Sequence, residues 1–365
     1  MAAPAVDFLV DKKSFSKTLA AEAPPLETLS LQDGEAVLRI DAFAFTANNV
    51  TYAAFGDQMQ YWNFFPAPAP YGRVPVWGFG EVAKSRAAGV EPGQRYYGYF
   101  PMSAYLVVKP ERVGAHGFSD GADHRKGLHP VYNAYQLTSS DPGYDKAHED
   151  AQMLLRPLFT TSFLIEDFLA DNKFFGAEQV VLSSASSKTA FGVAHLLHGR
   201  QAPRPRGVGL TSPANVAFTQ SLGCYDAVVP YDGVSALNSG MKTSFVDMAG
   251  NAGVRAAVHN HFRDNLAHSL LVGATHWEES GGSGAALPGA KPEFFFAPTQ
   301  VQKRNADWGR GGLEARLAAA WSSFRPMAMS SLKVQHLEGP EAVGHVFAAM
   351  VSGKARPDEA FILKL

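Results

Sequence analysis

Residues 180–192 read Val-Val-Leu-Ser-Ser-Ala-Ser-Ser-Lys-Thr-Ala-Phe-Gly, an apolar run that ends in four serines, a lysine and a threonine. The apolar run is typical of a buried strand, and residues 189–197 have the pattern of a helix with small residues on one side. Ligands of open parallel sheets bind beyond the carboxyl ends of strands, where the next helix offers N–H groups. The stretch therefore indicates a phosphate or pyrophosphate site, with a polar helix start that binds no ligand as the alternative.

Two other motifs fit the same residues less well. A P-loop would need glycines where Leu182 and Ser187 stand. A Ser-x-x-Lys nucleophile would need a serine in place of Ala185. Phosphate binding and helix capping thus stay open as interpretations of this stretch.

Strand and helix patterns alternate around this stretch. Residues 158–171 and 215–222 have the spacing of helices, and short apolar runs typical of buried strands lie at 207–210, 227–229, 243–248 and 269–273. Repeats of this length predict βαβ units and a parallel sheet. The first third differs, because short strand-like runs such as 36–43 and 74–82 are separated by Gly and Pro turns, which predicts a barrel-like β domain. Residues 111–150 have little periodicity, and we expect a functional insertion or a lid there.

Composition limits the class of protein. A chain of 365 residues exceeds what one hydrophobic core usually holds, so two domains are expected. The formal charge of −2 argues against a nucleic-acid partner, and the single cysteine, Cys224, excludes a disulfide framework within the chain. No leader-like N-terminus is apparent, and no apolar run approaches the roughly 20 residues of a spanning helix. We expect a soluble, cytoplasmic protein without a membrane partner.

The end of the second strand bears on the type of cofactor. Residues 211–215 read Thr-Ser-Pro-Ala-Asn, without the Asp or Glu that binds the ribose 2′-hydroxyl of NAD. A 2′-phosphate would be tolerated there, and Lys188 or Arg206 could neutralise it. This favours NADP, with an ordinary turn before a helix as the alternative.

Several motifs, in this order, resemble the medium-chain dehydrogenase/reductase superfamily. They are G-E-A-V-L-R-I-D-A-F-A-F-T-A-N-N at 34–49, V-E-P-G-Q-R-Y-Y-G-Y at 90–99, the stretch at 180–192, S-L-G-C-Y-D-A-V-V-P-Y-D at 221–232, F-V-D-M-A-G at 245–250 and L-L-V-G-A at 270–274. L-R-P-L-F-T-T-S-F-L at 155–164 and S-S-A-S-S-K-T-A at 183–190 resemble an uncharacterised bacterial family of unknown function within it.

The resemblance implies an α/β protein of two domains. A GroES-like β-rich catalytic domain would comprise residues 1–155 and 305–365, with the insertion at about 111–150. A Rossmann-type, doubly wound parallel sheet would comprise residues 156–304. The resemblance also implies a homodimer.

Metal ligands of the superfamily are missing. In zinc-dependent members a Cys stands near the position of Thr46 and a His-Glu pair near Val76-Trp77, and the Cys-rich zinc loop is absent here. We therefore expect no metal and a zinc-independent, quinone-reductase-like protein. The histidines at 116, 124, 129, 259 and 261 have irregular spacing and are interpreted as solvated.

Carried over by position, the resemblance assigns a cofactor site for NADP(H). Asn48 or Asn49 falls in the segment that faces the nicotinamide. The cofactor-binding set is Thr161 on the nicotinamide side, Ser184, Ser186, Ser187, Lys188 and Thr189 in the pyrophosphate turn, Thr211, Ser212 and Asn215 beside the adenosine ribose, and Ala249, Gly250 and Gly273 beside the nicotinamide ribose.

Candidates for the chemistry are few. Tyr52, His276 or a bound water is the proposed proton donor, because a nicotinamide supplies hydride while the protein orients substrate and supplies a proton. Asn49 is a further catalytic candidate. Tyr132, Asn133 and Tyr135 are expected to bind substrate. For each, packing or a surface loop is the alternative.

These observations predict an oxidoreductase that transfers hydride to a small carbonyl, quinone or activated alkene. A non-catalytic NADP-binding sensor or structural protein is one alternative. An enoyl-thioester reductase is the other, with Arg304 and Arg310 near a CoA phosphate.

Overall fold

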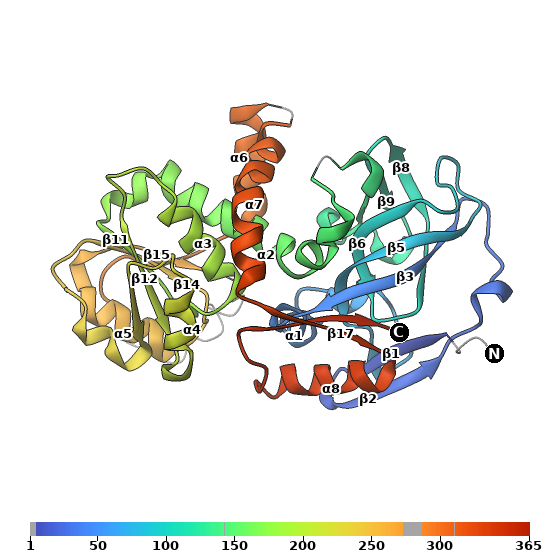
Figure 1. Ribbon diagram of the computed structural model, residues 1–365, viewed down its shortest axis with the longest axis horizontal. Coiled ribbons are helices and arrows are strands. Elements are labelled where there is room, and N and C mark those ends of the chain that lie inside the picture. The colour runs from blue at the N-terminus through green and yellow to red at the C-terminus, as the bar shows by residue number, and fades with distance from the viewer. Residues whose placement is uncertain (1–4, 142, 273–286, 310) are drawn as a thin grey trace. The chain divides into compact units, whose positions relative to one another are not determined.

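The computed structural model describes residues 5–141, 143–272, 287–309 and 311–365 (Figure 1). The chain divides into two compact units. The first unit comprises Met1–Leu154 and Leu332–Leu365, and the second comprises Leu155–Ser331.

The first unit is built on β-sheets. Its larger sheet has the order β17-β18-β3-β5-β6-β10-β9-β8, with β7 paired to β3, and its smaller sheet has the order β2-β1-β4. The bounds are β1 (Val6–Asp11), β2 (Ser14–Glu22), β3 (Ala36–Phe45), β4 (Tyr71–Gly72), β5 (Pro75–Ser85), β6 (Arg95–Pro101), β7 (Tyr105–Val108), β8 (Pro110–Gly114), β9 (Gly117–Asp120), β10 (Ala134–Leu137), β17 (Lys333–Glu338) and β18 (Glu359–Lys364). The helical elements of this unit include α1 (Ala47–Ala54), η2 (Tyr61–Phe64) and η4 (Pro130–Tyr132). Helix α8 (Pro340–Val351) packs against β17 and β18.

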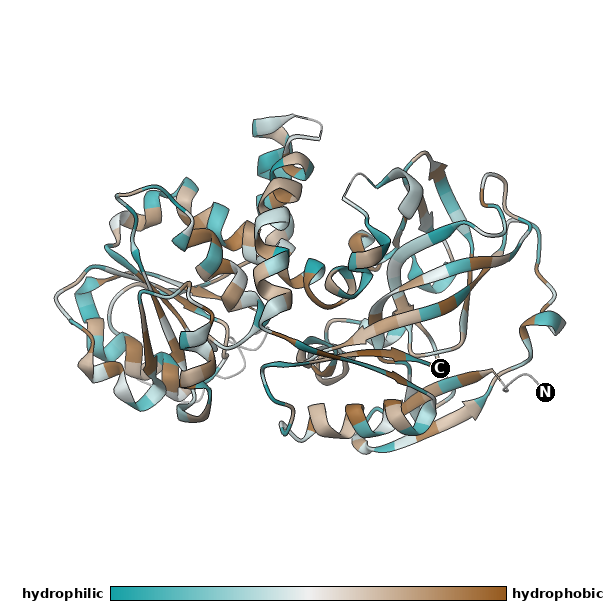
Figure 2. Ribbon diagram, viewed as in Figure 1, coloured by the Kyte–Doolittle hydropathy of each residue, from teal (hydrophilic) through white to brown (hydrophobic). Residues whose placement is uncertain are grey.

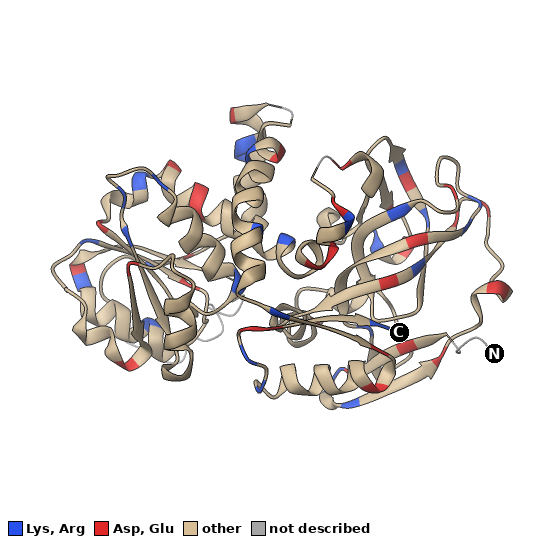
Figure 3. Cartoon of the chain, viewed as in Figure 1, with Lys and Arg blue, Asp and Glu red and all other residues tan. Residues whose placement is uncertain are grey.

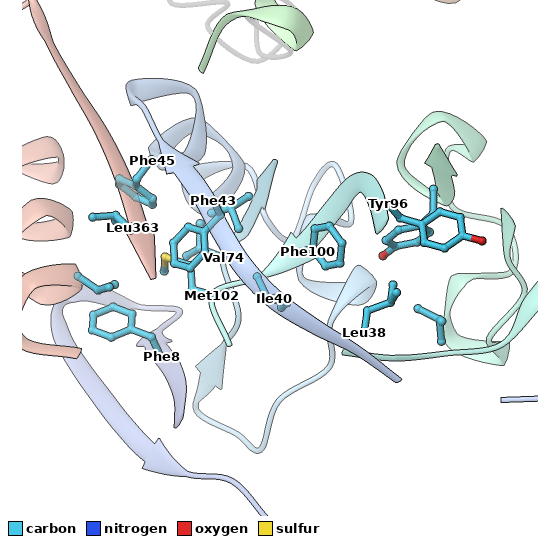
Figure 4. Packing of buried hydrophobic residues seen from close by; sticks show 14 of the residues in the cluster. Phe8, Leu38, Ile40, Phe43, Phe45, Val74, Tyr96, Phe100, Met102 and Leu363 are labelled. Atoms are coloured by element: carbon cyan, nitrogen blue, oxygen red, sulfur yellow. The ribbon is translucent and has the colours of Figure 1, made fainter. Parts of the chain in front are cut away.

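Apolar side chains of β3 form the centre of the first unit's core. Leu38, Ile40 and Phe43 are buried together with Phe100 of β6 and Leu363 of β18 (Figure 4). Burial of such side chains stabilises by roughly 1.5–3 kcal/mol each. The core therefore joins strands from both ends of the chain.

Residues 111–150 are not a separate lid. Strands β8, β9 and β10 extend the larger sheet beyond β6, through antiparallel pairs such as Gln136 with Tyr97 and Tyr135 with Phe118. Gly117, with φ of 133°, passes so close to the carbonyl of Tyr135 that a Cβ would lie 1.9 Å from its oxygen. The lid interpretation is thus wrong for these strands, because backbone pairing fixes them to the sheet.

The second unit is a parallel sheet with helices. Its order is β13-β12-β11-β14-β15-β16, and every pairing is parallel. The bounds are α2 (Glu149–Asp171), β11 (Gln179–Leu182), α3 (Lys188–His198), β12 (Arg206–Thr211), α4 (Val216–Ser221), β13 (Ala227–Pro230), β14 (Thr243–Asp247), α5 (Ala252–Phe262), β15 (Leu266–Leu271), β16 (Pro292–Phe294), α6 (Ala297–Trp308) and α7 (Gly312–Ser330). In chain order this is 3-2-1-4-5-6, the Rossmann arrangement. The predicted α/β fold class is confirmed.

Apolar residues concentrate on the strands of this sheet (Figure 2). Val181, Val208 and Phe245 of three neighbouring strands are at most 1% exposed. Such near-continuous apolar runs are what a parallel sheet covered on both faces requires.

The observed unit boundaries differ from the predicted domains at one end. The chain passes to the second unit at residues 154/155, one residue from the expected boundary, and returns at 331/332 instead of 304/305. Residues 305–331 stay in the second unit because Phe324 of α7 stacks on Phe159 of α2, at 4.5 Å between ring centroids, and contacts Phe191 of α3 at 5.1 Å.

The lengths of the helices and the distribution of charge bear on the class of protein. Among the described residues, no helix combines the length and apolarity needed to cross a bilayer. Lys and Arg are interspersed with Asp and Glu in each unit (Figure 3).

Helices α2 and α3 approach each other at Gly192. A Cβ on Gly192 would lie 2.5 Å from Ser162 Oγ, and that hydroxyl donates a 2.8 Å hydrogen bond to the carbonyl of Thr189. The substitution Gly192→Ala should destabilise the second unit by about 1–3 kcal/mol through overpacking. The thermal midpoint should then fall by roughly 2–4 °C per kcal/mol.

Gly199→Ala is the matched control for this prediction. Gly199 ends the same helix with φ of −71°, and its added Cβ would lie 3.5 Å from the nearest carbonyl oxygen. Equal midpoints for the two variants in calorimetry would contradict the close-packing argument.

Candidate functional site

The serine-rich turn follows β11, the first strand of the sheet. Ser187 caps α3 by accepting a 3.2 Å hydrogen bond from the N–H of Ala190, as a helix start requires. Ser184 has φ of 51°, a left-handed conformation that costs a non-glycine residue roughly 1–2 kcal/mol. The turn therefore has the shape of a glycine-containing turn, made with hydroxyl side chains.

A buried carboxylate joins this turn to the end of β14. Asp247 is 1% exposed; its Oδ1 accepts hydrogen bonds from Ser183 Oγ at 2.9 Å and from the Gly250 N–H at 3.1 Å. Its Oδ2 pairs with Arg255 Nε of α5 at 2.8 Å. Ser183 Oγ in turn accepts the Ala249 N–H at 2.9 Å. The ends of the two central strands thus share one acceptor.

A second set of contacts joins the turn to the end of β12. Ser186 Oγ accepts hydrogen bonds from Thr211 Oγ1 at 3.3 Å and from Asn215 Nδ2 at 3.2 Å. The structure thus brings together the residues predicted for the pyrophosphate turn and for the adenosine ribose. Arg206 is the first residue of β12 and Thr211 is the last, so Arg206 lies at the amino end of the strand, away from the predicted 2′-phosphate site, and its predicted role there is wrong. Lys188, the first residue of α3, lies at the carboxyl end of the strands, where the site is expected.

Two tyrosines that sequence reasoning missed hold the turn. The Ser184 N–H donates to the hydroxyl of Tyr231 at 3.2 Å, and the hydroxyl of Tyr225 donates to the carbonyl of Ala185 at 2.8 Å. Tyr231 directly follows β13, so its position after a third strand end was an available signal. Its own hydroxyl proton is not used in the bond that it accepts.

The other predicted cofactor residues lie on α2, on α3 and after β12. Thr161 Oγ1 bonds to the Pro157 carbonyl of its own helix at 3.4 Å, and Thr189 lies on the first turn of α3. Ser212 precedes a short helical turn after β12. Gly273 and His276 lie outside the described residues.

An aromatic group in the first unit surrounds Tyr52. We call it the phenol cluster, and it consists of Tyr52 of α1, Tyr61 of η2, Trp77 of β5, Tyr99 of β6 and Tyr132 of η4. The ring centroids lie 4.6 Å apart for Tyr52 and Tyr61, 4.6 Å for Tyr99 and Tyr132, and 5.5 Å for Tyr52 and Tyr99. The predicted residues Tyr52 and Tyr132 therefore belong to one site.

Hydroxyl groups within the phenol cluster are largely buried and lie close to one another. Trp77 Nε1 donates to the Tyr52 hydroxyl at 3.4 Å, and the hydroxyls of Tyr61 and Tyr132 are 3.5 Å apart. Burial raises the pKa of Tyr52 to about 12, and it raises the pKa of Tyr99 and Tyr132 well above the usual range. These phenols are thus neutral proton donors at ordinary pH.

Of the remaining predicted residues, Asn48 hydrogen-bonds the Tyr52 hydroxyl, while Asn49, Asn133 and Tyr135 have other partners. Asn49 completes the capping box of α1, because its Oδ1 accepts the N–H of the N-cap residue Thr46 at 2.7 Å. Its Nδ2 donates to the Pro75 carbonyl at 2.8 Å. Tyr135 lies in the hydrophobic core, and its hydroxyl donates to the Tyr99 carbonyl at 2.6 Å. Asn133 Nδ2 bonds to the Arg125 carbonyl at 3.4 Å.

A buried ion pair behind the cluster was not predicted. Arg125 Nε lies 3.0 Å from Asp120 Oδ2, and both side chains are at most 1% exposed. The Arg125 guanidinium also donates to the carbonyl of Tyr132 at 3.3 Å and lies 4.7 Å from the ring centre of Phe65. One cation therefore positions the segment that carries Tyr132.

The histidines include one correction. His259 is fully buried, not solvated, because its ring nitrogens lie 2.9 Å from Ser269 Oγ and 2.9 Å from the Pro288 carbonyl. Burial lowers its pKa. In the part of the chain that the structure describes, no three His, Cys, Asp or Glu side chains form a metal-binding group.

Comparison with known proteins gives one family match and many structural ones. Residues 43–356 match the family described as "Protein of unknown function (DUF2855)", and no curated protein matches the chain. The chain is similar to CurA from Vibrio vulnificus in complex with NADPH, with 11% identity, a TM-score of 0.61 and 98% of each chain covered. It is also similar to the yhdH oxidoreductase from Salmonella enterica in complex with NADP (14%, TM-score 0.55, 99% of each chain) and to a putative NADPH:quinone reductase from Bacillus thuringiensis (13%, 0.54, 99%). At these identities the likeness establishes the fold.

The Asp247 network generates a stability prediction. Asp247→Ala would leave Arg255 and the Gly250 N–H without their buried acceptor, so it should destabilise the second unit by about 3–5 kcal/mol. Urea unfolding followed by tryptophan fluorescence measures this loss. Exposed Asp264 offers the control, since Asp264→Ala should change stability by less than about 0.5 kcal/mol. Similar losses for both variants would show that Asp247 is not the organising acceptor.

Proposed function

We propose an activity for this chain, which belongs to the DUF2855 family of proteins of unknown function: NADP(H)-dependent, zinc-independent transfer of hydride to a small carbonyl, quinone or activated alkene. The observation that carries the proposal is the hydroxyl-rich turn between β11 and α3. It lies beside the junction of β11 and β14, where the strand order reverses and open α/β sheets bind ligands.

The residues of the turn fit a dinucleotide pyrophosphate. The N-terminal turn of α3 carries the positive end of the helix dipole, which favours phosphate. Ser184 keeps the left-handed conformation usually reserved for glycine, and Tyr231 offers a phenolic proton beside it. NADP(H) would be held by Ser184, Ser186, Lys188 and Tyr231, with Ala249 and Gly250 at the next strand end.

NADP is favoured over NAD by the end of β12. Thr211, Ser212 and Asn215 offer hydroxyl and amide groups where NAD-binding sheets place a carboxylate. A carboxylate there would repel a 2′-phosphate, and Lys188 would attract it. The similar CurA structure is a complex with NADPH and the similar yhdH structure is a complex with NADP, which supports the same assignment.

The proton required after hydride transfer is assigned to Tyr52. The cofactor supplies hydride, and Tyr52 donates to the oxygen that gains charge, with Trp77 Nε1 holding its hydroxyl. A donor role for His276 stays a prediction. Homodimerisation and a cytoplasmic location are proposed from the superfamily resemblance alone.

The enoyl-thioester alternative loses one supporting residue. Arg304 Nε lies 2.6 Å from Asp167, and its other nitrogens lie 3.0 Å from Asp171 and 2.8 Å from Asp307. Three carboxylates already neutralise this guanidinium, so it is a poor partner for a CoA phosphate. Arg310 lies outside the described residues.

Cofactor affinity provides the first test of the proposal. NADPH should bind at least about tenfold more tightly than NADH, a difference of about 1.4 kcal/mol, in titrations followed by intrinsic fluorescence. Lys188→Ala should weaken NADPH about tenfold by removing a charge-assisted contact. Lys242→Ala, at the amino end of β14, should leave affinity unchanged. A preference for NADH would contradict the argument from β12.

Turnover separates an enzyme from a binding protein. NADPH oxidation across quinones, enones and aldehydes should occur, and Tyr52→Phe should lower kcat about 100-fold, the lower range for a general acid. Because the pKa of Tyr52 is about 12, turnover should not fall between neutral pH and the usual tyrosine pKa of about 10. NADPH binding without oxidation of any acceptor would favour the sensor alternative.

A further inference from the structure

The phenol cluster gathers hydrogen-bond donors from five separate elements. Tyr52, Tyr61, Tyr99 and Tyr132 contribute hydroxyls from α1, η2, β6 and η4, and Trp77 of β5 contributes an indole N–H. Phenylalanine would pack as well as tyrosine, as Phe64 and Phe65 show, which lie in the same hydrophobic core as Tyr52 and Tyr99. Four phenols in one place therefore require an explanation beyond ring packing.

One of these hydroxyls has no protein partner in the described part of the chain. Tyr99 is fully buried, and no described residue hydrogen-bonds its hydroxyl. Buried hydroxyls are normally paired, because an unpaired one loses its bonds to water without replacement. A hydroxyl left in this way next to Tyr52 and Tyr132 indicates an acceptor supplied by a ligand.

Electrostatics around the cluster favour a negatively charged oxygen. The buried carboxylate of Asp120 is paired with Arg125. The guanidinium of Arg125 donates to the carbonyl of Tyr132 and lies 4.7 Å from the ring centre of Phe65. Burial raises the pKa of Tyr99, and the Arg125 charge acts in the opposite direction, so it favours an anionic oxygen beside that phenol. Neutral donors backed by a cation stabilise an oxyanion in a poorly hydrated site.

Ring geometry favours a flat ligand. Tyr61, Trp77 and Tyr132 are half-buried, so the cluster reaches the surface through aromatic edges and faces. Tyr61 and Tyr132 meet edge to face at 80°, an arrangement in which flat rings pack well. A planar, conjugated ring matches these surfaces better than a branched aliphatic chain.

We propose that the phenol cluster is an oxyanion site for planar, conjugated carbonyl compounds, in which the hydroxyls of Tyr52, Tyr99 and Tyr132 donate to the carbonyl oxygen. This inference rests on the proposed function. Addition of hydride oxidises NADPH to NADP⁺ and moves an electron pair of the conjugated system onto that oxygen, which forms an enolate or a hydroquinone anion and then takes a proton. Tyr99 thereby joins the substrate-binding residues.

Binding of para-nitrophenol to the full chain tests this site without NADPH. Its ionised and neutral forms differ in visible absorption, so titration reports both affinity and charge state. The bound form should be the phenolate, and para-nitroanisole, which has no ionisable oxygen, should bind at least about tenfold more weakly. Equal affinity for both probes would overturn the proposal.

Single hydroxyl deletions locate the donors. Tyr132→Phe and Tyr99→Phe should each weaken phenolate binding about tenfold and leave the affinity for para-nitroanisole unchanged. Tyr96→Phe is the matched control, because Tyr96 is 1% exposed in the same unit and its hydroxyl bonds to Gln94 Oε1 at 2.8 Å outside the cluster. Tyr132 is half-buried, so Tyr132→Phe keeps the test valid if the variant of the fully buried Tyr99 does not fold. Unchanged phenolate affinity in all cluster variants that fold would overturn the proposal.

The same titrations distinguish this inference from the proposed function. Phenolate binding in a protein that binds neither NADPH nor NADH would support the oxyanion site and reject the oxidoreductase. NADPH binding and turnover without phenolate binding would support the oxidoreductase and reject the oxyanion site.

Discussion

The second unit depends on one buried carboxylate. Asp247 stands where β14 ends, and it is the shared acceptor for the turn after β11, the turn after β14 and the guanidinium of Arg255. A buried charge is tolerated when it is paired and hydrogen-bonded, and these contacts meet that requirement. The position of the serine turn relative to its neighbouring strand ends follows from this arrangement.

Neutral hydroxyl groups are the common chemical feature of both candidate sites. In the second unit, serines and tyrosines occupy the turn where bare glycine backbone would leave room for a phosphate, and Ser184 carries the conformational cost. In the first unit, phenols supply donors without a net charge. Donors of this kind bind oxygen atoms through hydrogen bonds whose strength depends on distance and angle, so the position of each ring or turn determines affinity.

Sequence patterns predicted the sheet of the second unit well, because buried parallel strands are short apolar runs that end in turn residues, as at 179–182. They also placed Tyr52 and Tyr132 among the candidates. They missed the Arg125–Asp120 pair and misjudged His259, since burial of a polar side chain depends on partners distant in sequence. The boundary at 331/332 was missed because the apolar residues of α7 have the same spacing whichever unit they pack against.

The position of β18 determines the order in which the two units can fold during synthesis. Strand β18 lies between β17 and β3, and Phe361 pairs with Phe45, so the larger sheet of the first unit cannot form this pairing until residues 359–364 leave the ribosome. The second unit is one continuous segment that ends at Ser331. Because domains fold as units during synthesis, the second unit can fold while residues of the first still wait for their C-terminal partners. The unpaired β3 edge then needs protection from other chains until Leu332–Leu365 has been added.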